Sequence, residues 1–90
     1  MKYEELIEGS IYYCKWPNKY LYIMRRMAGE APCPYIELTE KTSSSYGYFH
    51  TTTCEYRVAT EEEQAHFLQC ERAGKYVEYT PIEYIPLIFN

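Results

Sequence analysis

The sequence lacks aspartate: all 13 of its acidic residues are glutamate. This absence argues against an aspartic dyad, an EF-hand, a kinase-like magnesium site and a Ser-His-Asp triad, because each needs an aspartate. No stretch approaches the roughly 20 apolar residues of a membrane-spanning helix, and the first residues lack the apolar core of a secretory signal. We therefore expect a cytoplasmic protein.

The cysteines are not arranged as metal ligands, since no C-x-x-C pair occurs. In a reducing compartment they should be free thiols that pack as small hydrophobic residues: Cys14, Cys33, Cys54 and Cys70. His50 and Cys54 have the spacing of two ligands, but no second pair follows. The sequence therefore predicts neither a metal nor a cofactor.

The length of 90 residues fits one domain. We expect a β-rich meander over residues 1–59, a helix over 60–74, and a closing strand with an apolar tail over 75–90. The net charge of −4 resides entirely in residues 60–90, because Lys and Arg balance Glu in residues 1–59. This acidic end argues against binding along a nucleic-acid duplex, but a local basic patch remains compatible with a small anionic ligand.

Alternating apolar residues and turn-forming residues predict short strands over 10–16, 19–25, 35–39, 46–50, 54–58 and 75–79. The segments 29–34 and 40–45 are predicted loops, and residues 3–8 are predicted to form one helical turn. On the fifth strand, Cys54, Tyr56 and Val58 should share the buried face.

Residues that typically begin and end a helix predict the helix over 60–74. Thr60 and Glu63 form a capping box, and Gly74 supplies the C-terminal stop. His66 should be exposed on this helix. The pattern predicts an α+β fold: a small antiparallel β-sheet or SH3-like barrel of about five to six strands, closed by one helix near residues 60–74.

Tyrosine is unusually abundant, with 12 among 90 residues, and several tyrosines lie among basic residues in the first hairpin. Rings beside cations can stack a nucleobase while the cations meet phosphate. The same rings can also fill the core of a small β-domain, with their hydroxyls reaching solvent. Both interpretations remain open. The first uses Tyr12, Trp16 and Tyr22 to stack a base, and Lys15, Arg25 and Arg26 to bind phosphate.

A hydroxyl-rich segment follows over residues 42–53. Its serines could cradle an anion or form a solvated hairpin tip. In the binding hypothesis Ser43, Ser45 and His50 close over the ligand. Catalysis is not expected, because His50 and Cys54 would lie roughly 13 Å apart on a regular strand, outside hydrogen-bond reach.

The tail holds six large apolar residues, Ile82, Tyr84, Ile85, Leu87, Ile88 and Phe89, which are too apolar to remain in water. They should close the barrel or pack across a subunit boundary, so we expect a homodimer or larger oligomer.

Two segments resemble small proteins encoded by bacteriophages and related mobile elements: residues 6–13, and residues 57–79 with the run Ala59-Thr60-Glu61-Glu62-Glu63 and the ending Ala73-Gly74-Lys75-Tyr76. In that group a Tyr-rich β-meander precedes such a helix. The resemblance implies a cytoplasmic factor that counters host defence, and it carries over no functional residue.

Three functions remain after these observations, none of them enzymatic, and the third is a regulatory SH3-like module. The first is sequestration of a small anionic ligand, such as a nucleotide second messenger, by the residues named above. The alternative is a protein–protein inhibitor of a defence effector, such as a CRISPR-type nuclease. Its surface would be acidic and aromatic, formed by Glu61, Glu62, Phe67 and Tyr76.

Overall fold

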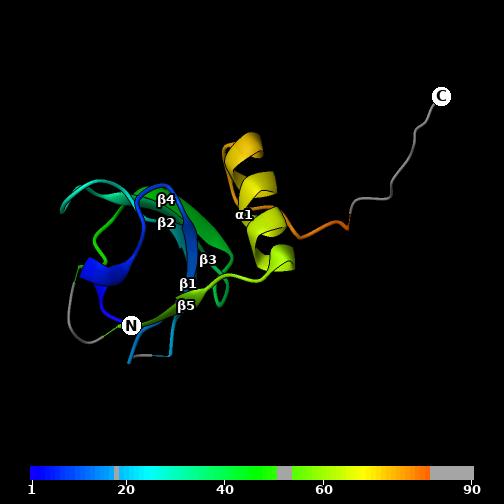
Figure 1. Ribbon diagram of the computed structural model, residues 1–90. Coiled ribbons are helices and arrows are strands. Elements are labelled where there is room, and N and C mark those ends of the chain that lie inside the picture. Colours follow the sequence, from blue (N-terminus) through cyan, green and yellow to red (C-terminus); the bar gives the residue numbers. More distant parts are fainter. Residues whose placement is uncertain (18, 51–53, 82–90) are drawn as a thin grey trace.

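In the part of the chain that the structure describes, residues 1–17, 19–50 and 54–81, five short strands and one α-helix form the fold (Figure 1). The structure is a computed structural model. In chain order the elements are the 3-10 helix η1 (Tyr3–Glu5), the strands β1 (Ile11–Lys15), β2 (Leu21–Arg25), β3 (Cys33–Glu37), β4 (Thr42–Gly47) and β5 (Glu55–Val58), and the helix α1 (Glu61–Ala73).

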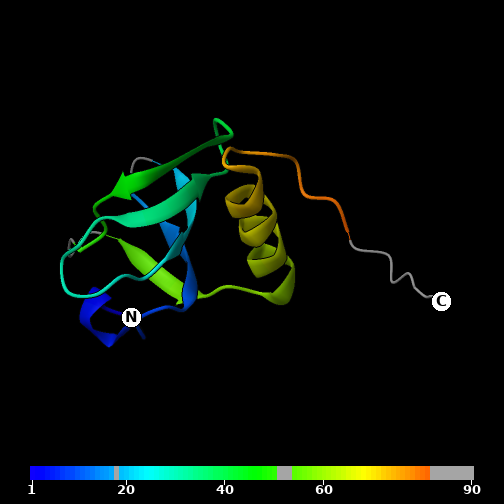
Figure 2. The same ribbon diagram turned by 90° about the horizontal axis from the view of Figure 1, so that it is seen from above.

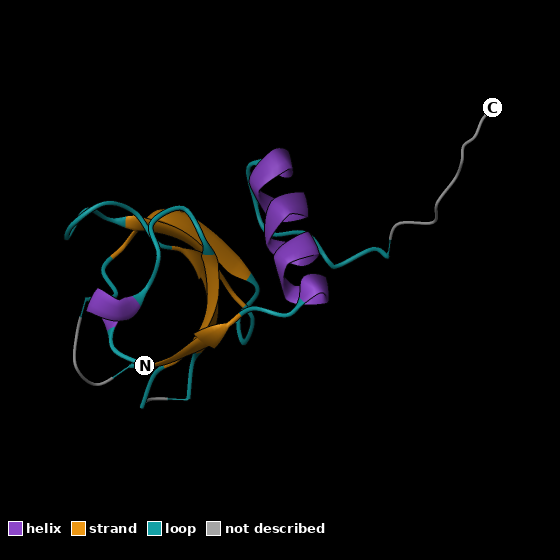
Figure 3. Cartoon of the chain, viewed as in Figure 1, coloured by secondary structure: helices purple, strands orange, loops and turns teal. Residues whose placement is uncertain are grey.

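The strands form one antiparallel sheet in the order β4-β3-β2-β1-β5. This confirms the predicted α+β fold of a small antiparallel sheet and one helix. β4 and β5 are the two edges and do not pair with each other, so the sheet curls without closing into a barrel (Figure 3).

Each face of the sheet carries its own cluster of buried residues, since successive side chains on a strand point to opposite faces. On one face, Ile11, Ile23 and Ile36 pack against Phe67 and Cys70 of α1. The other face carries a second cluster, which η1 and the loop after β4 help to cover. Its buried residues are Tyr3, Leu6, Tyr12, Cys14, Met24, Cys33, Phe49, Cys54 and Tyr56. Figure 2 shows η1 and α1 on opposite sides of the sheet.

The helix ends as the sequence predicts. The Thr60 hydroxyl accepts from the Glu63 amide at 3.1 Å, and the Glu63 carboxylate accepts from the Thr60 amide at 2.9 Å. Gly74 closes the helix at φ 72°, in the left-handed region that glycine adopts without steric cost. Glu63 also accepts two hydrogen bonds from Arg57 at 2.8 Å each, which joins β5 to the start of α1.

Because of this contact with Glu63, the free energy of unfolding depends on pH. The hydrogen bond from Arg57 lowers the pKa of Glu63 below its ordinary value. A lowered pKa gives stability that is present above the unfolded-state pKa, about 4.3, and is lost as pH falls through the folded-state pKa. We expect Glu63→Gln to destabilise the protein by about 1 kcal/mol at neutral pH. The difference should shrink in urea unfolding below about pH 4.

The matched control is Glu62→Gln, which removes an equal charge from the same helical turn at an exposed position. Its effect should stay smaller at neutral pH, because the structure gives Glu62 no part in the cap. Equal pH profiles for the two variants would contradict the role of Glu63.

The predicted loop over 40–45 and strand over 46–50 are both wrong, since β4 spans Thr42–Gly47. An edge strand meets solvent along one side, so it tolerates hydroxyl residues that carry no apolar alternation. The turn before it is organised by Glu37, which is buried. The Glu37 carboxylate accepts from the amides of Thr39 and Glu40 at 2.7 and 2.6 Å, and Lys41 completes the turn at φ 60°.

The predicted closing strand over 75–79 is also absent; the described segment after Gly74 runs back along α1 instead. Gln69 exchanges two hydrogen bonds with the backbone of Thr80, at 2.6 and 3.0 Å. The His66 ring bonds to the Val77 carbonyl at 2.8 Å and contacts the rings of Tyr76 and Tyr79. His66 is therefore buried and not exposed as predicted. Side chains of α1, and not a neighbouring strand, form the hydrogen bonds of the backbone at Val77 and Thr80.

Smaller differences concern segment ends. The first turn is the 3-10 helix η1 rather than a turn reaching residue 8. β3 begins at Cys33 and includes Pro34, which lies at the register shift against β4 where no ladder donor is required. Val58 is 60% exposed, unlike Cys54 and Tyr56. The predictions for Thr51–Thr53 and for the apolar tail over 82–90 lie outside the described residues.

Candidate functional site

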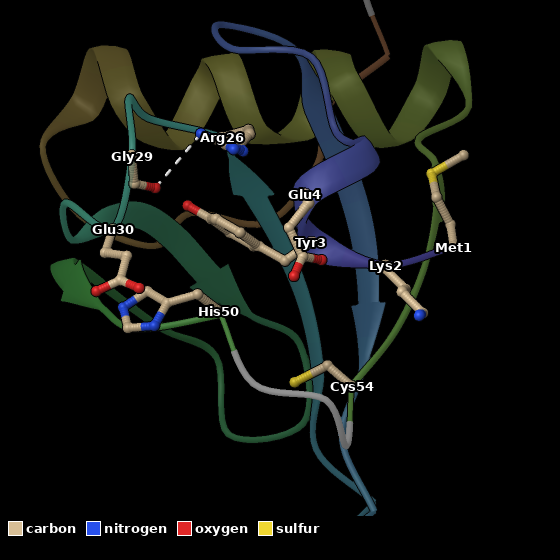
Figure 4. Close-up of a pocket in the computed structure, with 9 residues that line it drawn as sticks. All are labelled: Met1, Lys2, Tyr3, Glu4, Arg26, Gly29, Glu30, His50 and Cys54. Atoms are coloured by element: carbon tan, nitrogen blue, oxygen red, sulfur yellow. Dashed lines mark hydrogen bonds between the residues drawn. The ribbon is translucent and has the colours of Figure 1, made fainter.

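A cavity of about 380 Å³ opens on the side of the sheet opposite α1 (Figure 4). Segments that are far apart in the sequence form its walls: η1 and the residues before it, the loop after β2, and the chain on either side of residues 51–53. The lining residues are Met1, Lys2, Tyr3, Glu4, Arg26, Gly29, Glu30, His50 and Cys54.

Arg26 is the buried cation of this cavity, with 8% of its surface exposed. It follows β2 directly, and its backbone continues the pairing with the chain before β1, since its amide donates to Ser10 at 3.0 Å and its carbonyl accepts from Gly9 at 2.7 Å. The guanidinium carbon lies 4.3 Å from the centre of the Tyr3 ring. This cation–π contact and the continued ladder hold the side chain in place.

The charge of Arg26 is only partly compensated. One terminal nitrogen donates to the carbonyls of Met27 and, at 3.5 Å, Gly29. The Glu8 carboxylate lies 3.9 Å away, beyond hydrogen-bond distance. Nε of Arg26 is buried and has no hydrogen-bond partner among the described residues. A buried charge without full compensation is costly, so this position favours an added anion.

Aromatic rings continue the cavity wall away from Arg26. Tyr3 lies between Arg26 and His50, and the His50 ring is edge-on to Tyr3 and to Tyr48, with centroids 5.7 Å apart in each pair. His50 is exposed at the mouth and Tyr48 is exposed beside it, whereas Tyr3 is buried. A planar group can therefore reach ring surface at the mouth while a charged group approaches Arg26.

Tyr3 and Cys54, the two buried residues of the cavity lining that can lose a proton, are both protonated at neutral pH. Burial, followed by the hydrogen bond to Cys33, raises the pKa of Tyr3 to about 12. Burial also raises the pKa of the Cys54 thiol, whose neighbours include Cys14 and Tyr56. Cys54 is therefore a thiol rather than the thiolate that nucleophilic catalysis requires.

The mouth of the cavity carries charges of both signs. Lys2 is exposed there, and so are the carboxylates of Glu4 and Glu30. Exposed charges are screened by water, whereas the charge of Arg26 is not. The inner wall is thus cationic and the rim is mixed.

The predicted base-stacking residues lie in the core or pack against it. Tyr12 is buried, and its hydroxyl accepts from the Ile7 amide at 2.8 Å. Trp16 and Tyr22 pack edge-on against Phe49, at 6.2 and 5.3 Å between centroids. The structure brings none of these three rings to the cavity beside Arg26, because they pack in or against the cluster of large rings on this face of the sheet.

The predicted phosphate ligands are dispersed. Arg25 and Arg26 are successive residues, so they point to opposite faces. Arg25 pairs with Glu71 of α1 at 2.9 Å and lies over Phe67. Lys15 is exposed at the end of β1, opposite Glu55 in the register. Of the predicted cations, only Arg26 lines the cavity.

The hydroxyl residues and His50 also separate. His50 joins Arg26 at the cavity, as predicted. Ser43 and Ser45 line a different hollow of about 210 Å³, between β4 and the C-terminal end of α1. The structure therefore does not bring these two serines to the cavity beside Arg26.

Of the four residues predicted to form the alternative acidic and aromatic surface, the two glutamates are exposed and the two aromatic residues are not. Glu61 and Glu62 are exposed in the first turn of α1, as predicted. Phe67 is buried against the sheet and cannot anchor a partner. Tyr76 is half-buried, with its ring edge-on to His66 at 5.2 Å.

Tyr3, Glu30 and Cys54 line the cavity although the sequence does not predict them there. Only the fold brings them to Arg26, since the pairing of β1 with β2 and β5 aligns the three segments. The one available signal was Gly29 beside Glu30, which marks a turn directly after the second predicted strand.

Comparison of the chain with protein-family models, with curated proteins and with solved structures finds no match. The described residues contain no helix that is both long and apolar enough to cross a bilayer. They also contain no group of three or more potential metal ligands. The geometry around Arg26 therefore carries the functional argument.

Proposed function

We propose that this is a non-enzymatic binding protein that holds a small anionic ligand in the cavity beside Arg26. The observation that carries the proposal is the buried guanidinium whose charge is incompletely compensated at the cavity wall. Guanidinium groups favour phosphate and carboxylate, because their donors match the spacing of two oxygens.

The size and lining of the cavity support a nucleotide-like ligand. A volume of about 380 Å³ falls in the range of small-molecule sites. The rings of His50 and Tyr48 offer a surface on which a base can stack at the mouth. The resemblance to bacteriophage proteins supports the finer proposal that the ligand is a nucleotide second messenger of host defence, sequestered rather than converted.

The proposal is tested by titration calorimetry with inorganic phosphate, AMP and a cyclic dinucleotide. We expect one of the nucleotides to bind, and Arg26→Gln to weaken that binding at least about ten-fold, since a charge-assisted contact is worth about 1.5–3 kcal/mol. The matched control is Arg72→Gln, which removes the same charge from the exposed last turn of α1 and should leave affinity unchanged.

A second variant keeps the test decisive where Arg26→Gln disturbs folding. Glu30 is exposed at the rim, and Glu30→Gln removes a carboxylate that repels an anion. Affinity should rise about three-fold, in line with the worth of an exposed charge pair. The absence of binding by every probe at about 1 mM, or full affinity in a folded Arg26→Gln variant, would refute the proposal.

A further inference from the structure

The hydroxyl of Tyr3 makes only a weak hydrogen bond in the cavity wall. Its oxygen lies 3.4 Å from the sulfur of Cys33, and the Cys33 thiol donates to the Ala31 carbonyl at 3.6 Å. A thiol has a single proton, so the Tyr3 hydroxyl is the donor in its contact with the sulfur. Sulfur is a weak acceptor, and a phenolic hydroxyl can turn toward a stronger one. The Tyr3 proton can therefore be donated to a bound oxygen atom.

This hydroxyl belongs to the same wall of the cavity as the guanidinium of Arg26. The guanidinium carbon lies 4.3 Å from the centre of the Tyr3 ring, and Figure 4 shows the Tyr3 side chain extending between Arg26 and His50. Both residues are buried, with 6% of Tyr3 and 8% of Arg26 exposed. Burial raises the pKa of Tyr3 to about 12, so its hydroxyl keeps the proton at neutral pH. The wall thus presents one cation and one neutral donor.

The buried charge of this wall is a single positive charge. The Glu8 carboxylate lies 3.9 Å from a guanidinium nitrogen, but 63% of its side chain is exposed. The other charged or titratable residues around the mouth are exposed, where water screens them: Lys2, Glu4, Glu30 and His50. Arg26 can therefore balance a ligand group with one negative charge. A second negative charge would remain uncompensated in a buried position, which is costly.

We propose that, among nucleotides, the cavity selects a phosphodiester, whose phosphate has one negative charge and two free oxygens, and that the Tyr3 hydroxyl binds this phosphate together with Arg26. One free oxygen accepts from the guanidinium and the other from the Tyr3 hydroxyl, which turns away from Cys33. A phosphomonoester brings nearly two negative charges at neutral pH to the same single cation. This inference rests on the proposed function, because it names the class of anion that is held beside Arg26.

Cyclic AMP and AMP test the selection, since they share base and sugar and differ in phosphate charge. At about pH 8, where AMP carries two negative charges, we expect calorimetry to give at least about ten-fold tighter binding of cyclic AMP. Below about pH 6 AMP takes up a second phosphate proton, so its affinity should rise and the ratio of the two affinities should fall toward about three-fold. Any charge that His50 gains in acid acts on both nucleotides, and the ratio removes it.

Hydroxyl deletions test the role of Tyr3. Tyr3→Phe should weaken the binding of cyclic AMP about ten-fold, because a hydrogen bond to a charged group is lost. The matched control is Tyr13→Phe: Tyr13 also lies under an arginine, with Arg57 at 4.0 Å, but it packs on the face that α1 covers. That variant should keep wild-type affinity.

A third variant changes the competition for the hydroxyl proton. Cys33→Ala removes the sulfur acceptor and should strengthen the binding of cyclic AMP about two-fold, an effect that a purely structural role of Tyr3 would not produce. Its control is Cys14→Ala, which removes another buried thiol of the same cluster and should leave affinity unchanged.

Equal affinities for AMP and cyclic AMP at about pH 8, or wild-type affinity in a folded Tyr3→Phe variant, would overturn this proposal while ligand binding beside Arg26 still stands. If Tyr3→Phe does not fold, Cys33→Ala decides, and unchanged or weaker binding there would overturn the proposal. Absence of cyclic AMP binding at about 1 mM would also overturn it. The proposed function fails only if the other probes do not bind either.

Discussion

Phe49→Ala should destabilise the protein by about 3–5 kcal/mol, the cost of removing a fully buried ring. Phe49 is 2% exposed and lies at the centre of the aromatic cluster. Its ring is edge-on to Trp16, Tyr22 and Tyr35, with centroids 5.3–6.2 Å apart. Its carbonyl also accepts from the buried hydroxyl of Tyr56. A domain of this size is stable by about 5–15 kcal/mol, so the loss is a large share of the total.

The measurement is urea unfolding followed by circular dichroism and by the fluorescence of Trp16, the only tryptophan. Tyr48→Ala is the matched control, because it removes a ring that is next but one in sequence before His50 and is 58% exposed. That variant should change stability by less than about 0.5 kcal/mol. Similar losses in the two variants would show that Phe49 is not the centre of the core.

Glu37→Ala should cost about 3–6 kcal/mol, since each of its two charge-assisted hydrogen bonds contributes about 1.5–3 kcal/mol. The carboxylate is buried and holds the turn between β3 and β4 by accepting from two consecutive amides. Its removal leaves both amides without this partner and releases the start of the edge strand.

Two further variants separate this role from the charge itself. Glu37→Gln keeps one acceptor oxygen but sets an amide group against a backbone donor, so it should recover little of the loss. Glu40→Ala removes an exposed carboxylate from the same turn, which accepts a hydrogen bond from the Tyr20 hydroxyl at 3.0 Å, and should cost less than about 1 kcal/mol. Thermal unfolding ranks the three variants. A Glu40→Ala loss equal to that of Glu37→Ala would contradict the assignment.

The parts of the fold that sequence predicted are those fixed by local chemistry. Thr60, Glu63 and Gly74 determine the ends of α1 from within a few residues of each end, and the capping box is confirmed. The central strands carry apolar alternation on both faces, so β1 and β2 were found within one to two residues of their ends. β4 was misplaced because its edge position permits serine and threonine, which carry no such signal.

The candidate site could be predicted only in part. Arg26 and His50 were among the predicted residues, but the residues next to them in sequence do not line the cavity. Strand alternation sends Arg25 to the face covered by α1, whereas Tyr12 and Trp16 pack in and against the aromatic cluster on the opposite face. Tyr3 and Cys54 reach the cavity through pairing between distant segments, which no local pattern reports.

The burial of all four cysteines gives the chain internal reporters of its own opening. Cys14 and Cys33 belong to the cluster under η1, and Cys70 belongs to the cluster under α1. An alkylating reagent reaches these three sulfurs only when the layer above each of them detaches, so the modification rates measured by mass spectrometry report on the opening of the two layers separately. Such rates distinguish helix release from sheet opening without any introduced label.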